Sequence, residues 1–461
     1  MAGPANFLRK DSPDSNVRPH QVRREILAAV AVVSFACGLR IFVWRNYGQE
    51  SIGMDPQWYV DLSKTLFSRD FLHYQGERVP LYLLLNLVCG YDFETLRLIN
   101  ACLGTATSVL LYLSVHQECG SSWAALLAAA FYNMLLVPVM LEAQPMPDAL
   151  ACFFLTLFLT SWIVLQRSKS KPLLVLCGMS LSAAGLTRPE CLIGLPVFFV
   201  LALADAWRAD GAETRRDKIS RLKWLAPPLL LPVLLWCAFL KISCGSFTPT
   251  TLTGYALMTI IGDKIEDAPE PYHAIRDLYI PERELTIRKS GNSSMAIWSG
   301  VIDRMMAATG ESFAELSGTL GRLSLRLIWM HPGHYLKTAA HSFCHFFFGH
   351  PYRTTLTLHT VRSPVLKAYL ERGTPMVLVG ALNVMYFLLL PLVALRASRS
   401  GKCLSAASLS AFLVLAGALA QAMMALAANP RYLYTWITLV IFFVFSVCWP
   451  KVRPERLEPS P

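Results

Sequence analysis

The stretch Ile26–Trp44, ILAAVAVVSFACGLRIFVW, decides the fold class of this 461-residue chain. Arg40 is its one charged residue. The hydrocarbon core of a bilayer is about 30 Å thick, and about 20 mostly apolar residues cross it as an α-helix. A basic segment precedes the run, but no small-residue cleavage site follows, and the run is long for the apolar part of a signal peptide. We therefore expect a retained transmembrane helix here.

Nine further apolar runs of this kind occur along the chain. They are Leu96–Val115, Trp123–Leu141, Asp148–Gln166, Pro172–Leu186, Cys191–Trp207, Trp224–Ile242, Met376–Leu395, Leu404–Ala427 and Tyr432–Trp449. The composition agrees, because 54% of the residues are hydrophobic and 16% are charged, against about 25% charge in soluble domains. The sequence thus predicts an all-α polytopic membrane protein with about ten transmembrane helices.

The basic residues set the expected orientation and explain the formal net charge of +11. They gather in short clusters beside apolar runs, as the positive-inside rule predicts for cytoplasmic ends. The clusters are Arg9, Lys10, Arg18, Arg23 and Arg24; Arg167, Lys169 and Lys171; Arg215, Arg216, Lys218, Arg221 and Lys223; Arg396, Arg399 and Lys402; and Lys451, Arg453 and Arg456. With ten helices all of these clusters lie on one side, so both termini are predicted to be cytoplasmic and no nucleic-acid partner is expected.

Two long segments then face the opposite, outer compartment, at 45–95 and 243–375. Their mixture of aromatic, apolar and charged residues is typical of helices that lie in the membrane interface. Within the second segment, Leu320–Phe348 is expected to form an interfacial or re-entrant helix, and the helix count changes if it spans the membrane.

Two carboxylates lie at outer ends of predicted helices. Asp55 follows the first helix, in GMDPQWYVD (53–61), and Asp148 opens the fourth, in QPMPDAL (144–150). Either one alone is equally well explained as a helix cap that complements the helix dipole. Together they suit proton abstraction from a hydroxyl group and hydrogen bonding to a sugar or an amine.

Three arginines lie at outer ends as well, against the positive-inside trend. They are Arg78, Arg188 and Arg431. A guanidinium group binds phosphate through a planar fork, whereas the alternative is snorkelling to lipid headgroups. Arg40 and Arg97 lie in or beside apolar runs, and we expect them to pair with carboxylates of the outer loops in a structural role.

Metal and nucleotide sites receive little support. His341 and His345 have a spacing that can place two metal ligands on one helical face, but no carboxylate stands at a matching spacing. No cofactor is therefore predicted, with a divalent metal as the alternative. The chain has no Walker loop and no GxGxxG after a strand, so energy is expected to enter with the substrate.

The ordered set of short motifs resembles the GT-C glycosyltransferases, specifically the dolichyl-phosphate-mannose protein mannosyltransferase-like family, which includes the lipid A aminoarabinose transferases. The motifs are Leu39-Arg40, Asp55 with Tyr59, RVPLY (78–82), LRLIN (96–100), PDAL (147–150), LTRPE (186–190) and, more weakly, Arg431. Two departures occur: Pro56 stands where the family commonly has Glu, and Arg78 stands where Lys is frequent.

The resemblance implies a role for each matched residue. Asp55 would be the general base and Asp148 a second acidic group near the acceptor. The donor phosphate would be bound by Arg78, Arg188, Arg431 and Tyr432, and the substrate by Tyr59, Tyr82 and Glu190.

The resemblance also implies an organisation and an activity. We expect a cytoplasmic tail at 1–25, a GT-C-like catalytic module at 26–242 with an outer loop at 45–95, an outer segment at 243–375 with interfacial or re-entrant helices, C-terminal transmembrane helices at 376–449 and a cytoplasmic tail at 450–461. The expected activity is inverting transfer of a sugar from a polyprenyl phosphate, undecaprenyl or dolichyl, to a protein, lipid or glycan acceptor on the outer face. The length favours the bacterial inner membrane over the endoplasmic reticulum. A polyprenyl-lipid flippase or transporter is the alternative, although no inverted repeat is visible.

Overall fold

The computed structural model describes residues 19–47, 54–69, 71–168, 170–208, 212–291, 293–349, 360–400, 404–424 and 431–449. Within these ranges every regular element is a helix, and the one strand-like contact is an isolated bridge between Tyr47 and Val361. The predicted all-α fold is confirmed. Most of the two predicted cytoplasmic tails lies outside the described residues.

Eight helices of the described chain are long and apolar enough to cross a membrane. They are α1 (Pro19–Asn46), α4 (Phe93–Cys119), α7 (Asp148–Arg167), α9 (Gly194–Trp207) with the preceding η3 (Pro189–Ile193), α10 (Ala212–Cys244), α17 (Thr374–Ser400), α18 (Ala406–Met424) and α19 (Arg431–Cys448). The chain is thus an integral, multi-pass membrane protein.

The other two predicted spans differ from expectation. The run Pro172–Leu186 forms α8 (Lys171–Thr187), which is apolar but shorter than the eight. The prediction of one helix over Trp123–Leu141 is wrong, because this run divides into α5 (Ser122–Met134) and α6 (Val137–Glu142). Leu136 between them has a φ of 55°, a left-handed conformation that an α-helix cannot continue through.

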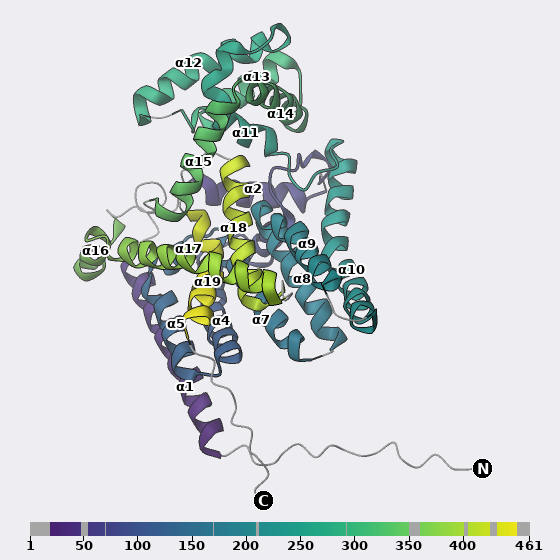
Figure 1. Cartoon of the computed structure of the whole chain (residues 1–461). Helices are drawn as coiled ribbons and strands as arrows, with labels where there is room; N and C mark the ends of the chain where they lie inside the picture. The colour runs from purple at the N-terminus through teal and green to yellow at the C-terminus, as the bar shows by residue number, and fades with distance from the viewer. Residues whose placement is uncertain are drawn as a thin grey trace, which may run out of the picture.

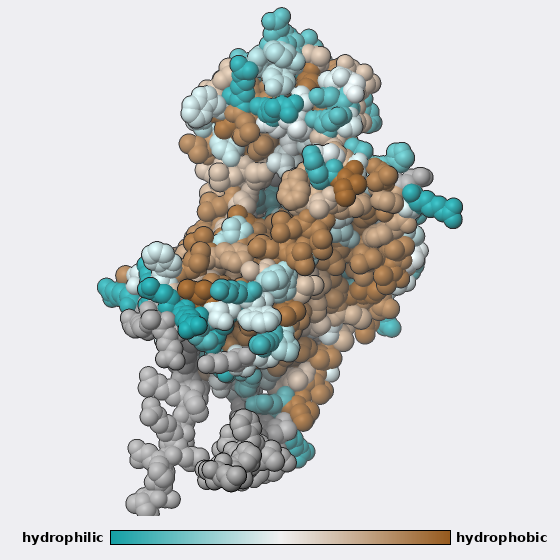
Figure 2. Space-filling view, turned by 90° about the vertical axis from the view of Figure 1, so that its right-hand side faces the viewer, coloured by the Kyte–Doolittle hydropathy of each residue, from teal (hydrophilic) through white to brown (hydrophobic). Residues whose placement is uncertain are grey.

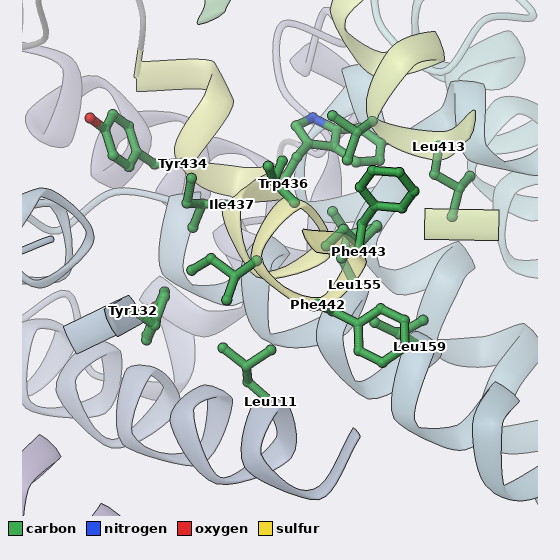
Figure 3. Packing of buried hydrophobic residues seen from close by; sticks show 14 of the residues in the cluster. Leu111, Tyr132, Leu155, Leu159, Leu413, Tyr434, Trp436, Ile437, Phe442 and Phe443 are labelled. Carbon is green, nitrogen blue, oxygen red and sulfur yellow. The ribbon is translucent and has the colours of Figure 1, made fainter. Parts of the chain in front are cut away.

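Helices α7 and α19 form the centre of the bundle. In each, 72% of the membrane window is buried inside the protein, against 28% in α1. Figure 3 shows Phe442 and Phe443 of α19 packed beside Leu155 and Leu159 of α7. In Figure 1, α1 lies at one edge of the bundle and α10 at the opposite edge.

Exposed apolar side chains cover the flanks of this bundle. Figure 2 shows a continuous hydrophobic surface across the middle of one face, below a top of mixed polarity. Such a surface is unfavourable in water and suits contact with lipid tails.

The predicted outer segments carry further helices. The first contains α2 (Met54–Leu66), η2 (Phe71–His73) and α3 (Pro80–Val88). The second contains α11 (Thr253–Ile261), η4 (Gly262–Asp267), η5 (Glu270–Tyr272), α12 (His273–Ser290), η6 (Ala296–Trp298), α13 (Val301–Thr309), α14 (Phe313–Met330), α15 (Pro332–Phe348) and α16 (Pro364–Glu371). Helices α11 to α14 lie together above the bundle in Figure 1, and we call them the outer cap.

The outer cap has a hydrophobic core of its own, to which Tyr255, Ile297 and Leu320 contribute. The expectation of one helix over Leu320–Phe348 is wrong. The run breaks at His331, where Pro332 begins α15, because proline cannot donate the backbone hydrogen bond that a continuing helix needs. Its first part belongs to the cap core, and α15 returns the chain toward the bundle.

Candidate active site

Four helix ends meet on the side of the bundle that faces the outer cap. They are the start of α2, the start of α7, the junction of α8 with η3, and the start of α19. Asp148 is the first residue of α7 and Arg431 the first of α19. Arg188, which precedes Pro189, has the extended backbone (φ −140°, ψ 119°) that proline favours in the residue before it.

Asp148 lies at the centre of an ion-pair cluster. Its Oδ1 atom accepts a hydrogen bond from Nη1 of Arg188 and lies 3.4 Å from Nε of Arg431. Arg188 also donates through Nε to Glu190. The Asp148 side chain is 4% exposed and that of Arg188 5%, so two guanidinium groups compensate a charge that would otherwise be costly to bury.

These contacts bear on the interpretation of Asp148 as a helix cap. The N-cap position of α7 belongs to Pro147, and no side-chain cap bond is present there. The carboxylate of Asp148 turns to the two arginines instead. Asp148 therefore makes no cap hydrogen bond, while its charge in the first turn of α7 still complements the helix dipole.

Asp55 is the accessible carboxylate of the site. It lies in the first turn of α2, and its Oδ2 atom is 3.9 Å from Nη1 of Arg431. Its side chain is 56% exposed, in contrast to the buried Asp148. A carboxylate with one long ionic contact and an open side remains available to accept a proton.

Tyr432 places an aromatic face beside both arginines. The Cζ atom of Arg188 lies 4.7 Å from the ring centroid, and that of Arg431 lies 5.9 Å from it. Stacking on the ring restricts the guanidinium groups. The predicted phosphate-binding residues Arg188, Arg431 and Tyr432 therefore lie in direct contact.

Arg78 lies on the α2 side of the cluster. Its Cζ atom is 4.4 Å from the ring centroid of Trp58 and 4.9 Å from that of Tyr59. Burial raises the pKa of Tyr59, while the charges of Arg78, Arg188 and Arg431 act in the opposite direction. Tyr59 thus lies within the electrostatic field of all three arginines.

Tyr82 supports this arrangement from inside the protein. Its ring packs edge-on against Tyr59, with centroids 5.2 Å apart, and its side chain is fully buried. Burial raises the pKa of Tyr82 well above its usual range. The residues predicted for the site therefore form two contact groups that interact electrostatically: Asp55, Asp148, Arg188, Glu190, Arg431 and Tyr432 in one, and Tyr59, Arg78 and Tyr82 in the other.

Two members of the neighbourhood were not predicted from the sequence. Trp58 stacks on Arg78 and faces Trp298 of η6, with ring centroids 6.5 Å apart. Asn100 of α4 donates to the carbonyl oxygen of Gln144, at 3.0 Å, and so braces the turn before Asp148. The signals for this brace were the polar asparagine within the apolar run of α4 and its place at the end of the motif LRLIN (96–100).

A second group of buried charges lies at the junction of α1 with α6. Arg40 donates to Glu142 at 2.9 Å and to Oδ1 of Asn133 at 2.7 Å. Arg97 pairs with Glu94 at 2.8 Å. The predicted pairing of Arg40 and Arg97 with carboxylates is confirmed, and their structural role stays a prediction.

The histidine spacing in α15 brings two rings close together. The ring centroids of His341 and His345 are 5.3 Å apart. In the described ranges no three His, Cys, Asp or Glu side chains gather as a metal site would require.

Comparison with known proteins identifies a family segment. Residues 86–249 match the model of the family described as dolichyl-phosphate-mannose-protein mannosyltransferase. No curated protein matches this chain at a significant level. The matched segment includes Asp148, Arg188 and Glu190.

Two solved structures show weak similarity. One is the Archaeoglobus fulgidus oligosaccharyltransferase tethered to an acceptor peptide, with 15% identity, a TM-score of 0.48 and coverage of 92% of this chain, which spans about half (49%) of that protein. The other is ArnT from Cupriavidus metallidurans bound to undecaprenyl phosphate, with 15% identity, a TM-score of 0.32 and coverage of 92% of this chain and 77% of that one. The predicted resemblance itself is confirmed: residues 86–249 of this chain match the family model of the dolichyl-phosphate-mannose-protein mannosyltransferases.

Proposed function

We propose that the chain is an inverting glycosyltransferase, which moves a sugar from a polyprenyl phosphate to an acceptor on the outer face of the membrane. The observation that carries this proposal is the contrast within one cluster: an exposed carboxylate, Asp55, beside two stacked and largely buried arginines, Arg188 and Arg431. The matched family, whose description names dolichyl phosphate mannose, supports a lipid phosphate as the donor.

The reaction uses the two parts of the cluster separately. Asp55 accepts the proton of an acceptor hydroxyl group while the hydroxyl oxygen attacks C1 of the sugar. The bond from C1 to the phosphate oxygen breaks, and its electron pair leaves with polyprenyl phosphate. Arg188 and Arg431 stabilise the negative charge that develops on that oxygen, as donors fixed in place before the reaction.

The remaining residues hold these groups in position. Asp148 and Glu190 fix the Arg188 guanidinium through its two ion pairs. Tyr432 stacks on both arginines. Asp148 is therefore proposed as a positioning residue, because its Oδ1 is engaged by both arginines and its side chain is buried.

Arg78 is proposed to contact the donor from the side of α2, where Tyr59 and Trp58 restrict it. No metal takes part in this scheme. The bacterial inner membrane, with undecaprenyl phosphate as the lipid, is the preferred location, and the endoplasmic reticulum, with dolichyl phosphate, is the alternative. The acceptor is a protein, a lipid or a glycan.

Release of free polyprenyl phosphate tests the proposal. Purified protein in detergent is given a panel of polyprenyl phosphate sugars with cell lysate as the source of acceptor. Wild type should release the lipid phosphate from one of them, and Asp55→Asn should reduce the rate by about 10² to 10⁴ fold, the usual contribution of a general base.

Asp61→Asn is the matched control. Asp61 is an exposed carboxylate on the same helix, and its Oδ1 atom accepts a hydrogen bond from Nε2 of Gln57 at 2.9 Å. This variant should keep the wild-type rate. A rate for Asp55→Asn within about threefold of wild type would rule out its role as base.

A further inference from the structure

A cavity of about 280 Å³ lies at the opposite end of the bundle from the candidate active site. Helices α7, α8, α9 and α10 and the start of α18 line it. Leu165, near the end of α7, lies on its wall, and Asp148 begins the same helix. At about 1.5 Å per helical residue the two are about 25 Å apart, so the cavity is separate from the active site.

The inner part of the cavity is apolar. Leu165, Leu174, Phe198 and Ala202 line it, and each of these side chains is buried in the bundle. The volume is close to the lower end of the usual range for ligand pockets, about 300 Å³. It has room for part of one hydrocarbon chain.

The mouth of the cavity is charged. Lys218 lies there, and its ammonium group is held by Asp205 at 2.8 Å. Arg221, one helical turn further along α10, also lines the mouth and contacts Asp217 at 3.2 Å. An exposed i,i+4 pair of this kind contributes little, and most of the five donors of the Arg221 guanidinium group are available to a ligand.

The surrounding charge favours an anion. The segment 212–224, which includes Lys218 and Arg221, has five basic residues and two acidic ones. Lys171, at the start of α8, adds a further ammonium group nearby, 4.7 Å from the ring centroid of Trp224. This is the side that the positive-inside rule predicts to be cytoplasmic.

Exposed tryptophans place the mouth at the level of the lipid headgroups. Trp207, the last residue of α9, is 77% exposed, and Trp224 of α10 is 55% exposed. Tryptophan side chains gather at the boundary between headgroups and hydrocarbon, because one part of the indole ring is apolar and the other donates a hydrogen bond. A ligand of this cavity would therefore come from the bilayer.

We propose that this cavity binds an anionic phospholipid of the cytoplasmic leaflet, with its phosphate on Arg221 and part of one acyl chain against Phe198 and Ala202. Basic pockets between transmembrane helices on the cytoplasmic side are suited to such headgroups. The lipid would join α10 to α7 and α9 at the membrane boundary and so stabilise the bundle.

The thermal unfolding midpoint of the full-length protein in detergent tests this proposal. The probes are dioctanoyl phosphatidylglycerol, dioctanoyl phosphatidylcholine and inorganic phosphate. Phosphatidylglycerol should raise the midpoint of wild type in a saturable manner, because a ligand that binds the folded state stabilises it. The other two probes should raise it much less.

Two variants address the two parts of the site, and a third is the control. Arg221→Gln removes the phosphate contact, and Ala202→Leu fills the apolar part. Each should weaken the apparent affinity for phosphatidylglycerol by about tenfold or more. Arg23→Gln removes the same charge from an exposed position on α1, at the other edge of the bundle, and should bind as wild type does.

Three results would overturn the proposal. Equal stabilisation by phosphatidylcholine would show that charge is not recognised, and equal stabilisation by inorganic phosphate would show a site for a free anion. Wild-type affinity in Arg221→Gln and Ala202→Leu would place the lipid elsewhere. If one variant fails to fold without lipid, the other still decides the outcome.

Discussion

Two buried groups of arginines and carboxylates lie near the outer ends of the helices, and they differ in what surrounds them. In the first, Arg40 and Glu142 are 4% and 3% exposed, and the small cavity that they line together with Trp44 and Arg97 has a volume of about 10 Å³. In the second, Arg188 and Asp148 are equally buried, but Arg431 and then Asp55 continue the group to the surface.

The partners of the two groups differ in the same way. Arg40 is bonded by Asn133 and by the Ala36 carbonyl oxygen, and Glu142 accepts from Tyr132 at 3.2 Å. A methyl group added at Gly104 would lie 2.1 Å from Glu142 Oε1, and the cavity beside the pair, about 10 Å³, has room for no more than about one water molecule. A buried ion pair in a membrane protein is therefore weak evidence for a binding site. The second group differs because its contacts continue through Arg431 to the exposed side chain of Asp55.

The largest expected effect is a loss of stability when the buried Arg40–Glu142 pair is broken. Glu142→Gln leaves the charge of Arg40 buried without its counter-ion, and breaking a buried pair in this way costs about 3–5 kcal/mol. The unfolding midpoint in detergent should fall strongly, while the rate of polyprenyl phosphate release per folded molecule stays near that of wild type.

The double variant with Arg40→Gln is the control, because it removes both charges and should recover part of the loss. A strong loss of activity per folded molecule in Glu142→Gln would remove the distinction between the two groups. The Arg40–Glu142 pair would then belong to the catalytic machinery.

The second effect is a loss of catalytic rate when the group of Asp148, Arg188, Arg431 and Asp55 is changed. Arg188→Gln removes a fixed donor for the leaving phosphate, and the loss of one such donor reduces kcat by about 10² to 10³ fold. Asp148 keeps its contact with Arg431, so the protein should still fold. The measurement is the rate of donor cleavage at saturating donor, normalised to folded protein.

Arg188→Lys sharpens this test. Lysine keeps the charge but cannot bond Asp148 and Glu190 through a planar fork, so its activity should lie between those of wild type and Arg188→Gln. Full activity in either variant would assign the phosphate to other residues.

Much of the bundle could be predicted from the sequence, because the thickness of the bilayer fixes the length of each apolar run. The run Tyr432–Trp449 differs from α19 by one residue at each end. The break at Leu136 could not be predicted from hydropathy, because it depends on one backbone conformation. The fold of the outer cap could not be predicted from the sequence either, because its core depends on contacts between distant residues. One example is the stacking of Tyr255 on Phe313, whose ring centroids are 4.5 Å apart.

The candidate active site could likewise be predicted in part from the sequence. Charges at outer helix ends are costly unless they are paired or hydrated, so the sequence indicated which residues would gather there. It could not indicate which would be partners, because the pairing of Arg188 with Asp148 joins the ends of two different helices. Trp58 gave no signal, because its role depends on the position of Arg78 in the folded chain.

The smallest effect is expected beside the site, at Glu77, the neighbour of Arg78. Burial raises the pKa of Glu77 above 4.5. The folded state therefore holds this proton more tightly than the unfolded state, and stability falls as the pH rises from 4.5 through the raised value. At neutral pH the charged side chain is therefore unfavourable in the folded state.

Glu77→Gln should accordingly raise the unfolding midpoint at neutral pH, and the difference from wild type should disappear at pH values below 4.5. Glu270→Gln removes an exposed carboxylate from the second outer segment and should show no such dependence on pH. A constant difference at every pH would mean that the Glu77 side chain acts through its shape and not its charge. A lower midpoint at neutral pH would mean that Glu77 is paired with Arg78 in solution. Arg78 would then be held by Glu77, which contradicts its proposed contact with the donor.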